Sequence, residues 1–488
     1  MAFTEASSHL LGVMPSVWIL SIIALPVLTI TYYGAILIYN IWLHPLSKYP
    51  GPILAKASPL WMAWSYFHGR TPVELQEIHK KYGPVVRIGP NDLSYINPIQ
   101  WREIYGFKSH GQEEFSKDPR YHSGIEGEPI ILNADKTYHG YIRKLLAHGF
   151  SEKSLRDQES ILKGFVDTLF RRLHEECQDG EKTIDIVNWY NFLLFDFIAY
   201  LTFGESFDCL TTGTLHTWVG TFFSLVKSLS YYQISSRLPF FLRPLFIMQF
   251  VPKKIKGDLK TLKALNELVE AFNMGKMSPQ QLQGNAQILL AAGSETTATL
   301  MSGLTWLLLK HPRVHEKLKT EIRAKFSHPD EITISSVNEC KYLLGCIEEA
   351  LRVYPPSPQP HHRIIPAGGA MVNGEFLPAG TSVSIPIYAI SNSALNWTQP
   401  ESFIPERWTG EDERFANDKR ESSQPFSYGP RNCIGRNMAY AEMRLVMARL
   451  IWHFDVESAT TGDWMDQRVF LVWEKGPLHI KLRPVARA

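Results

Sequence analysis

The stretch from Leu282 to Leu309 constrains the fold most strongly, because Glu295 is its single charged residue. Ser278 and Pro279 precede it, and a serine cap followed by a first-turn proline is a strong helix start. A helix that is apolar on nearly all sides is buried. The rest of the chain should therefore pack around this helix, which predicts a large, mainly α-helical domain with a minor β component.

Composition supports one large unit after an N-terminal appendage. The chain has 488 residues, of which 45% are hydrophobic, and it shows no composition break, repeat or low-complexity linker. Its net charge of +2 gives no field that would attract nucleic acid, so we expect no nucleic-acid partner. The cysteines are sparse, odd in number and without a Cys-x-x-Cys pair, which fits a reducing compartment. They are Cys177, Cys209, Cys340, Cys346 and Cys433.

The N-terminal segment has the composition of a membrane anchor. No Asp, Glu, Lys or Arg occurs between Glu5 and Lys48. Residues 18–43 are long enough to cross a bilayer, which takes about 20 apolar residues. A cleaved signal peptide is the alternative, but the tail before this run lacks positive charge and the run is too long. Lys48, Lys56 and Arg70 follow the span, and positive charge stays in the cytosol.

These features divide the chain into four parts. We expect a luminal tail over residues 1–17, a transmembrane anchor over 18–43, a Pro-rich linker over 44–58 and one folded domain over 59–488. The charge asymmetry places the folded domain in the cytosol. The sequon at Asn396 should then carry no glycan.

Two local patterns within the domain also predict structure. Asn373-Gly374 lies between apolar flanks, which is a strong signal for a tight β-hairpin. Residues 205–260 are rich in aromatic side chains, and we expect several short helices and loops there.

The sequence FSYGPRNCIG surrounds one cysteine with residues suited to a bound metal cofactor. Gly429 and Gly435 allow unusual backbone conformations and the close approach of a flat ligand. A helix that begins just after Cys433 would favour a thiolate, and Arg431 could bind a carboxylate. Phe426 would shield the sulfur from water. This set suggests an iron–porphyrin with propionates. A buried structural thiol and a papain-like nucleophile are the alternatives, but neither needs such a loop.

The acid in the central helix has two readings. A buried carboxylate is costly unless it is paired or hydrogen-bonded, so Glu295 could be a structural acid that pairs with an arginine. The functional reading assigns each neighbour a task in oxygen chemistry. Gly293 leaves room for a diatomic ligand, the Thr296 hydroxyl can hydrogen-bond dioxygen, and Glu295 can carry protons from solvent.

A pair of opposite charges lies further along the chain. Glu349 and Arg352 fall on one face of a predicted helix, at a spacing of three. The spacing alone is weak evidence, because Glu411 and Arg414 repeat it in a polar stretch where we expect no such role.

Taken together, these motifs resemble the cytochrome P-450 family. Positions 426–435 match its haem-thiolate loop, AGSETT at 292–297 is similar to its acid–alcohol signature, and FIPERW at 403–408 follows the Glu-x-x-Arg pair in the family's order. The resemblance implies the cytochrome P-450 fold, a helical haem-thiolate domain with small β-sheets, after an N-terminal transmembrane helix. It implies haem b with Cys433 as the iron ligand, and it adds Arg407 to the buried pair of Glu349 and Arg352.

The same resemblance extends to further cofactor-binding residues. His139, Arg143 and Arg363 match family positions that contact the haem propionates. Glu295 and Thr296 match the pair that supports protonation of dioxygen before the O–O bond breaks.

The resemblance is closest to fungal microsomal enzymes of secondary metabolism, of the isotrichodermin-hydroxylase type. It implies an endoplasmic reticulum enzyme that hydroxylates or epoxidises an apolar terpenoid, polyketide or alkaloid. NADPH–cytochrome P-450 reductase would supply electrons to a monomer. A haem-thiolate isomerase or dehydratase that needs no external electrons and a non-catalytic haem sensor are the alternatives.

Overall fold

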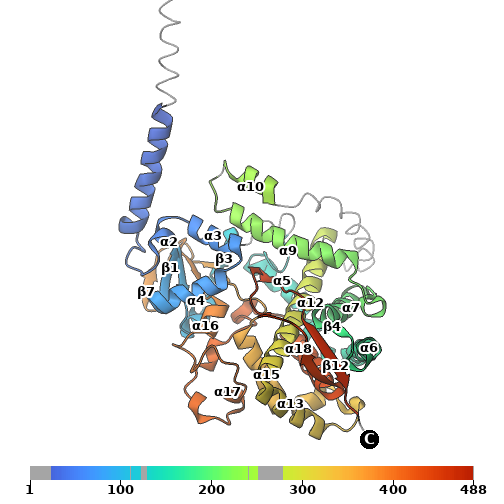
Figure 1. Cartoon of the computed structure of the whole chain (residues 1–488). Coiled ribbons are helices and arrows are strands. Elements are labelled where there is room, and N and C mark those ends of the chain that lie inside the picture. The colour runs from blue at the N-terminus through green and yellow to red at the C-terminus, as the bar shows by residue number, and fades with distance from the viewer. Residues whose placement is uncertain (1–22, 110, 122–128, 240, 251–277, 487–488) are drawn as a thin grey trace, which may run out of the picture.

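The central helix predicted from the sequence is the axis of the domain. The computed structural model describes residues 23–486, except for 110, 122–128, 240 and 251–277 (Figure 1). Helix α12 (Pro279–Lys310) runs through the domain, and Ser278 caps it. The Ser278 Oγ accepts from the Gln281 N–H, and the Gln281 side chain accepts from the Ser278 N–H, both at 3.1 Å. This capping box confirms the predicted helix start.

Among the described helices, four pack most extensively against α12, and apolar residues between them form the main core. They are α7 (Ile186–Phe203), α13 (Pro312–Lys325), α15 (Lys341–Val353) and α18 (Arg436–His453). Other helices lie outside this layer. They are α2 (Ile53–Ala57), α3 (Leu60–His68), α4 (Thr71–Tyr82), α5 (Lys136–Leu146), α6 (Glu152–Cys177), α8 (Cys209–Thr212), α9 (Thr217–Ser235), α10 (Arg243–Phe250), α14 (Ile334–Val337), α16 (Ile387–Ser391) and α17 (Glu406–Thr409).

The β component is small, as predicted. A five-stranded sheet has the order β1-β2-β8-β5-β3, and a three-stranded sheet has the order β4-β12-β9. The strands of the first are β1 (Val85–Gly89), β2 (Asp92–Tyr95), β3 (Ser116–Lys117), β5 (Arg363–Ile364) and β8 (Ser382–Ser384). Those of the second are β4 (Thr183–Asp185), β9 (Phe454–Ser458) and β12 (His479–Pro484).

Two hairpins complete the strands. One pairs β6 (Ala370–Val372) with β7 (Glu375–Leu377) through Asn373-Gly374, whose φ angles are 55° and 73°, and this confirms the predicted turn. The other pairs β10 (Val469–Phe470) with β11 (Val472–Trp473). The expectation of only short helices over 205–260 was wrong for α9, which is a single helix of 19 residues. Residues 251–260 lie outside the described residues.

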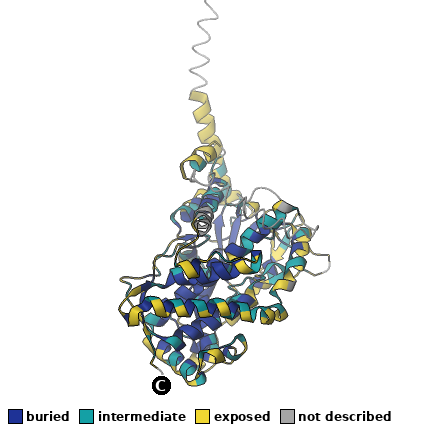
Figure 2. Cartoon of the chain, turned by 90° about the vertical axis from the view of Figure 1, so that its right-hand side faces the viewer, coloured by how far each residue is buried: buried dark blue, intermediate teal, exposed yellow. Residues whose placement is uncertain are grey.

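An apolar helix precedes the domain and is almost wholly exposed (Figure 2). It spans Ile23–Leu43 and is long enough to cross a membrane. Helix α7 is also long and apolar, but it is buried in the core. The start of the predicted anchor, residues 18–22, and the predicted tail over 1–17 lie outside the described residues.

The predicted linker is packed onto the domain instead of spanning free space. Leu46 is 1% exposed, and the Tyr49 hydroxyl donates to Glu375 Oε2 at 2.6 Å. The Arg87 N–H donates to the Pro50 carbonyl at 2.7 Å. The helix Ile23–Leu43 is therefore joined to the five-stranded sheet through a fixed segment.

Candidate active site

Backbone hydrogen bonds and one obligatory glycine hold the cysteine loop. The Cys433 N–H donates to the Phe426 carbonyl at 2.9 Å. Gly429 has a φ of 75°, and a Cβ there would lie 1.9 Å from the Tyr105 carbonyl oxygen, so no other residue fits. Gly435 has an ordinary φ of −85°, and the prediction of an unusual backbone there was wrong. A Cβ on Gly435 would lie 4.0 Å from Cys433 Sγ, so its small size keeps this side of the sulfur open.

Cys433 is exposed, whereas the other four cysteines are buried. Although the residue is accessible to solvent, the surrounding protein atoms reduce the hydration of its sulfur and raise the pKa of the thiol. The Gly435 N–H and the Arg143 and Arg436 guanidiniums act in the opposite direction. The predicted effect of the helix start thus has the expected sign, because the Gly435 N–H lowers the pKa of the thiol, but it is smaller than the effect of desolvation. A metal cation bound to the sulfur would reverse the balance, because a coordinating thiol is deprotonated.

Basic side chains converge on one side of the loop. Lys117 of β3 is the register partner of Arg363 of β5, and Arg363 is buried. Arg431 lies nearby, with its Nε donating to Glu114 and its Nη1 donating to the Ala134 carbonyl at 2.9 Å. Burial and the charges of Arg363 and Arg431 lower the pKa of Lys117 to about 7.

His139 adjoins the same basic side chains. It is buried on α5, and burial, followed by the charges of Arg431, Lys117 and Arg143, lowers its pKa to about 4. His139 therefore adds no charge near neutral pH, but Arg363, Arg431 and Lys117 still hold more positive charge than Glu114 balances, which is a costly arrangement in a buried site. A ligand with two carboxylates, such as a porphyrin with propionates, suits this donor set.

Arg143 does not join this group through a hydrogen bond. Its two Nη atoms donate to the backbone and side-chain oxygens of Asn432, each at 2.5 Å. Arg143 therefore lies beside Cys433, where we expected Arg431 to supply the positive charge.

The acid and the alcohol of α12 face different neighbours. Thr296 is half-buried, and its hydroxyl donates to the Ala292 carbonyl at 2.6 Å. The carboxylate of Glu295 is buried and forms an ion pair with Lys475. The structural reading of Glu295 is thus correct in that the acid has a buried partner, but the partner is a lysine and not an arginine.

Gly293 allows α12 to approach α7. A Cβ on Gly293 would lie 3.1 Å from Ile198 Cδ1, which is tighter than ordinary van der Waals contact. The structure thus gives Gly293 a packing role, and the predicted room for a diatomic ligand stays a prediction.

A second buried acid joins α12 to the helix that follows the cysteine loop. Glu442 of α18 is hydrogen-bonded to Thr297, the residue after Thr296. Burial raises the pKa of Glu442 to about 8, and the bond to Thr297 opposes that shift. Glu442 Oε1 has no hydrogen-bond partner among the described residues. Glu442 therefore links α12, which carries Thr296, to α18, the helix that follows the Cys433 loop.

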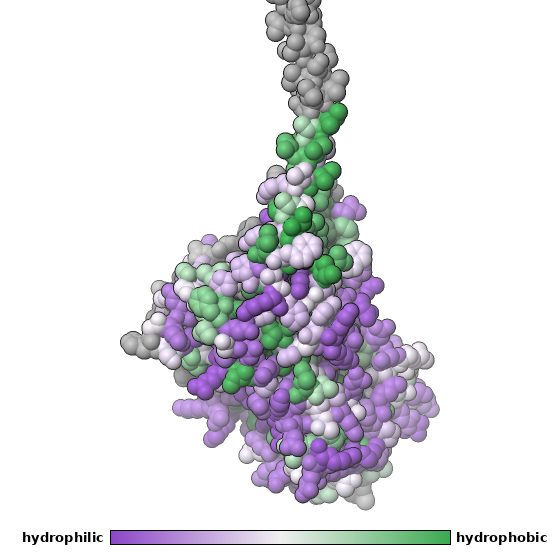
Figure 3. Space-filling view, turned by 90° about the vertical axis from the view of Figure 1, so that its left-hand side faces the viewer, coloured by the Kyte–Doolittle hydropathy of each residue, from purple (hydrophilic) through white to green (hydrophobic). Residues whose placement is uncertain are grey.

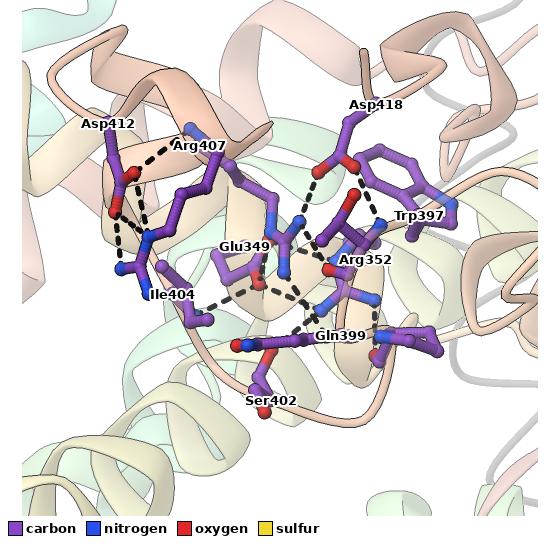
Figure 4. A network of polar contacts seen from close by, with 12 residues as sticks. Glu349, Arg352, Trp397, Gln399, Ser402, Ile404, Arg407, Asp412 and Asp418 are labelled. Carbon is purple, nitrogen blue, oxygen red and sulfur yellow. Dashed lines mark hydrogen bonds and ion pairs between the residues drawn. The ribbon is translucent and has the colours of Figure 1, made fainter. Parts of the chain in front are cut away.

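The predicted charged triad is present and fully buried (Figure 4). Arg352 donates two hydrogen bonds to the Glu349 carboxylate, at 2.7 and 2.9 Å. Arg407 Nε donates to the same carboxylate at 2.9 Å and also pairs with Asp418. Glu411 and Arg414, which have the same spacing in the sequence, do not pair with each other. Arg414 binds Asp412, and Glu411 binds Lys317.

Backbone carbonyls complete the network, so no guanidinium of the triad depends on one partner. Arg352 donates to the carbonyls of Ser391, Pro400 and Ser402 at 2.7–2.9 Å. The Trp408 indole N–H donates to Glu349 Oε2 at 2.8 Å. This set ties α15 to α17 and to the loop before α17.

Comparison with known proteins agrees with the motifs. A model of the cytochrome P450 family (here written P-450) matches residues 54–482. The chain belongs to the cytochrome P-450 family. It is 41% identical over 485 residues to the cytochrome P-450 monooxygenase hepD of Aspergillus oryzae, covering 96% of this chain and 97% of the relative. It is 39% identical over 472 residues to an averantin hydroxylase of Dothistroma septosporum, covering 91% and 88%.

Membership in the cytochrome P-450 family fixes the general chemistry. The protein binds haem b and is a monooxygenase that takes electrons from a redox partner and acts on an apolar substrate. The predicted mainly α fold with small sheets is confirmed.

The sequence did not predict two basic residues of this cytochrome P-450 site, Lys117 and Lys475. Lys117 follows no local motif, and its only signal is a lone lysine in a short strand. Lys475 is 180 positions from its partner Glu295, and no pattern in the sequence joins them.

Proposed function

We propose that the protein is a cytochrome P-450 that hydroxylates or epoxidises an apolar terpenoid, polyketide or alkaloid of fungal secondary metabolism. Two fungal averantin hydroxylases, 39% and 38% identical to this chain, support a hydroxylation. The observation that carries the proposal is the single exposed thiol, Cys433, beside the excess of buried basic groups.

In this proposal, Cys433 binds the haem iron, and Phe426 and Gly435 border the sulfur. Bound haem supplies the activation of dioxygen. Thr296 and Glu295 deliver protons, and Gly293 leaves room beside them on α12.

The haem propionates would supply the negative charge that balances the basic side chains of the site. Lys117, Arg363, Arg431 and His139 lie close enough together to share two carboxylates, and Arg143 can turn from Asn432 toward them. The propionates would neutralise the positive charge of these side chains that Glu114 leaves unbalanced, which supports this assignment.

The direct experiment is the spectrum of the reduced protein with carbon monoxide. We expect the absorption band of a thiolate-ligated haem in the wild type and its loss in Cys433→Ser. Cys346→Ser, at a buried cysteine of α15, is the control and should keep the band. A wild-type band at the position of imidazole-ligated haem would reject the proposal.

NADPH dependence separates the proposal from its rivals. An isomerase or dehydratase would convert substrate without an electron donor, and a sensor would consume no oxygen. We expect turnover only when both NADPH and NADPH–cytochrome P-450 reductase are present. In this proposal the enzyme that receives the electrons is a monomer.

A groove of about 550 Å³ beside the cysteine loop suits the reductase. Phe426 and Tyr440 line it, together with the acidic residue Glu348 and the two basic residues Lys341 and Arg436, so basic residues are in excess. An acidic partner would be attracted to this face, so Lys341→Glu should raise the KM for the reductase, most clearly at low salt. An unchanged KM would place the docking surface elsewhere.

We also propose that the protein lies on the endoplasmic reticulum membrane with its domain in the cytosol. Exposed apolar residues continue from the helix Ile23–Leu43 onto the domain (Figure 3). Leu54 and Trp64 belong to α2 and α3, and Leu245 and Met248 belong to α10. The rings of Phe67 in α3 and Phe250 in α10 are 5.2 Å apart, so these helices adjoin.

Glycosylation of an added sequon tests this orientation. The natural Asn396 cannot report it, because its side chain is buried and donates to the carbonyls of Ile96 and Ile390. A sequon placed within residues 1–17 should be glycosylated, and one placed in an exposed loop of the domain should not. The reverse result would overturn the proposed topology.

A further inference from the structure

Glu295 and Thr296 are neighbours in sequence but point in different directions. Successive residues of an α-helix are about 100° apart around its axis. Thr296 shares its face with Ala292, which is exposed, whereas Glu295 shares its face with Thr299, which is buried. An acid that delivers protons at Thr296 must therefore turn away from the position seen in the structure.

Lys475 holds the acid in that position. The side chains of Lys475 and Glu295 are only 4% and 3% exposed, and the ammonium donates to Glu295 Oε1 and, at 2.6 Å, to Thr299 Oγ1. The Thr299 hydroxyl in turn donates to Glu295 Oε1 at 3.2 Å. Two side chains thus donate to one carboxylate oxygen and are also bonded to each other.

The other carboxylate oxygen is left open. Glu295 Oε2 is buried and has no hydrogen-bond partner among the described residues. A buried carboxylate oxygen without a partner is costly, and it is the atom best placed to accept a proton.

The segment that carries Lys475 is itself fixed, so the ammonium has a defined place. The Trp473 indole N–H donates to the Pro355 carbonyl at 2.8 Å, and its ring stacks on Tyr354 at 4.9 Å. The Glu474 N–H closes the base of the β10–β11 hairpin by donating to the Arg468 carbonyl at 2.8 Å.

We propose that Lys475 is a positioning residue for proton delivery, an inference that rests on the proposed role of Glu295 and Thr296. The ion pair with Lys475 holds the Glu295 carboxylate turned away from Thr296. When Oε2 accepts a proton from solvent, the neutral carboxyl loses most of its attraction to the ammonium and can turn toward Thr296. Delivery of that proton restores the carboxylate, which returns to Lys475.

The test compares the haem-loaded variants Lys475→Met, Lys475→Gln and Lys475→Arg with wild type. Without the ammonium, the acid is no longer held, so hydrogen peroxide released per NADPH should rise several-fold in the Met and Gln variants. The solvent deuterium isotope effect on kcat should fall, because proton uptake no longer breaks an ion pair. Lys475→Arg keeps the charge and should restore both values.

Glu474→Gln is the matched control, because it removes a surface ion pair with Lys227 from the same segment. It should change neither the peroxide yield nor the isotope effect. The dissociation constant of the substrate and the haem content, which do not depend on turnover, should stay close to wild type in Lys475→Gln.

A double variant distinguishes positioning from a structural role. In a Glu295→Gln background, Lys475→Met leaves no buried charge unpaired, so it should add nothing to the peroxide yield and should lower the unfolding temperature less than it does in the wild type. If Lys475→Met and Lys475→Gln lose only stability and remain fully coupled, the inference is wrong. If Glu295→Gln and Thr296→Ala also remain fully coupled, the proposed proton relay itself fails.

Discussion

Lys117 and Arg363 face each other across the antiparallel pair of β3 and β5. Like charges directly opposite one another in a sheet repel, and here burial strengthens the repulsion. Their shared neighbour Arg431 adds a third positive charge, and Glu114 supplies one carboxylate against them. The protein thus stores a positive charge that an anionic ligand can neutralise.

Lys117→Met should have opposite effects on the two forms of the protein. The haem-free form should become more stable, because one repelling charge is removed. The haem-loaded form should retain haem about 10- to 100-fold less well, since a hydrogen bond to a charged group contributes about 1.5–3 kcal/mol and each 1.4 kcal/mol is tenfold. Thermal unfolding of both forms and haem transfer to apomyoglobin would measure this. Lys136→Met, at an exposed position of α5, is the control. Equal destabilisation of both forms would contradict the assignment.

Glu349→Ala should prevent the protein from folding around haem. The substitution leaves Arg352 and Arg407 buried without their shared carboxylate, and the loss of one member of a buried ion pair costs about 3–5 kcal/mol. The soluble haem-loaded fraction after expression gives the readout. Glu411→Ala, which has the same sequence spacing to an arginine but only a surface pair with Lys317, should fold normally. A haem-loaded Glu349→Ala protein would show that the network is dispensable.

Thr296→Ala should uncouple oxygen consumption from product formation. The hydroxyl donates to Ala292 but keeps lone pairs that can accept from a partner on its open side. We expect hydrogen peroxide per NADPH to rise several-fold, with a stability change within about 0.5 kcal/mol. Ser302→Ala removes a hydroxyl with the same helical bond, to Ala298 at 2.7 Å, from a buried face and should stay coupled. Coupled turnover in Thr296→Ala would remove this residue from the mechanism.

Glu442→Gln should stabilise the protein increasingly as the pH rises. The pKa of Glu442 is raised by burial from 4.5 to about 8. The folded state therefore keeps a proton that the unfolded chain releases, and stability is lost as the pH rises between these two values. Glutamine cannot ionise, so the free energy of unfolding of the variant relative to wild type should rise by up to a few kcal/mol between about pH 5 and about pH 9. The unfolding temperatures of both proteins across this pH range would measure the difference. A difference that does not change with pH would mean that Glu442 is ionised in the folded protein.

Local patterns predicted the parts of the site that lie close together in the chain. The loop around Cys433, the start of α12 and the Asn373-Gly374 turn each depend on residues within a few positions, and the structure has all three. The prediction for Gly435 was wrong because the sequence does not show why a glycine is present. Here the lack of a Cβ leaves room near the sulfur, and the φ angle is ordinary.

Pairs that form only in the folded chain could not be predicted in this way. Lys475 meets Glu295, Lys117 meets Arg363, and Asp418 joins Arg407, and none of these contacts has a periodic signal. The orientation of Arg143 toward Asn432 was missed for the same reason, since a helical spacing tells which face a side chain lies on but not which partner it selects.

The packing of residues 44–57 against the sheet has a practical consequence for producing a detergent-free enzyme. Leu46 fills the core and Tyr49 and Pro50 are hydrogen-bonded to the domain, so this stretch is part of the folded body. A truncation that removes the chain up to residue 43 should leave the fold whole. Cutting at residue 58, where composition alone would place the border, should expose the sheet and lower the yield of intact protein.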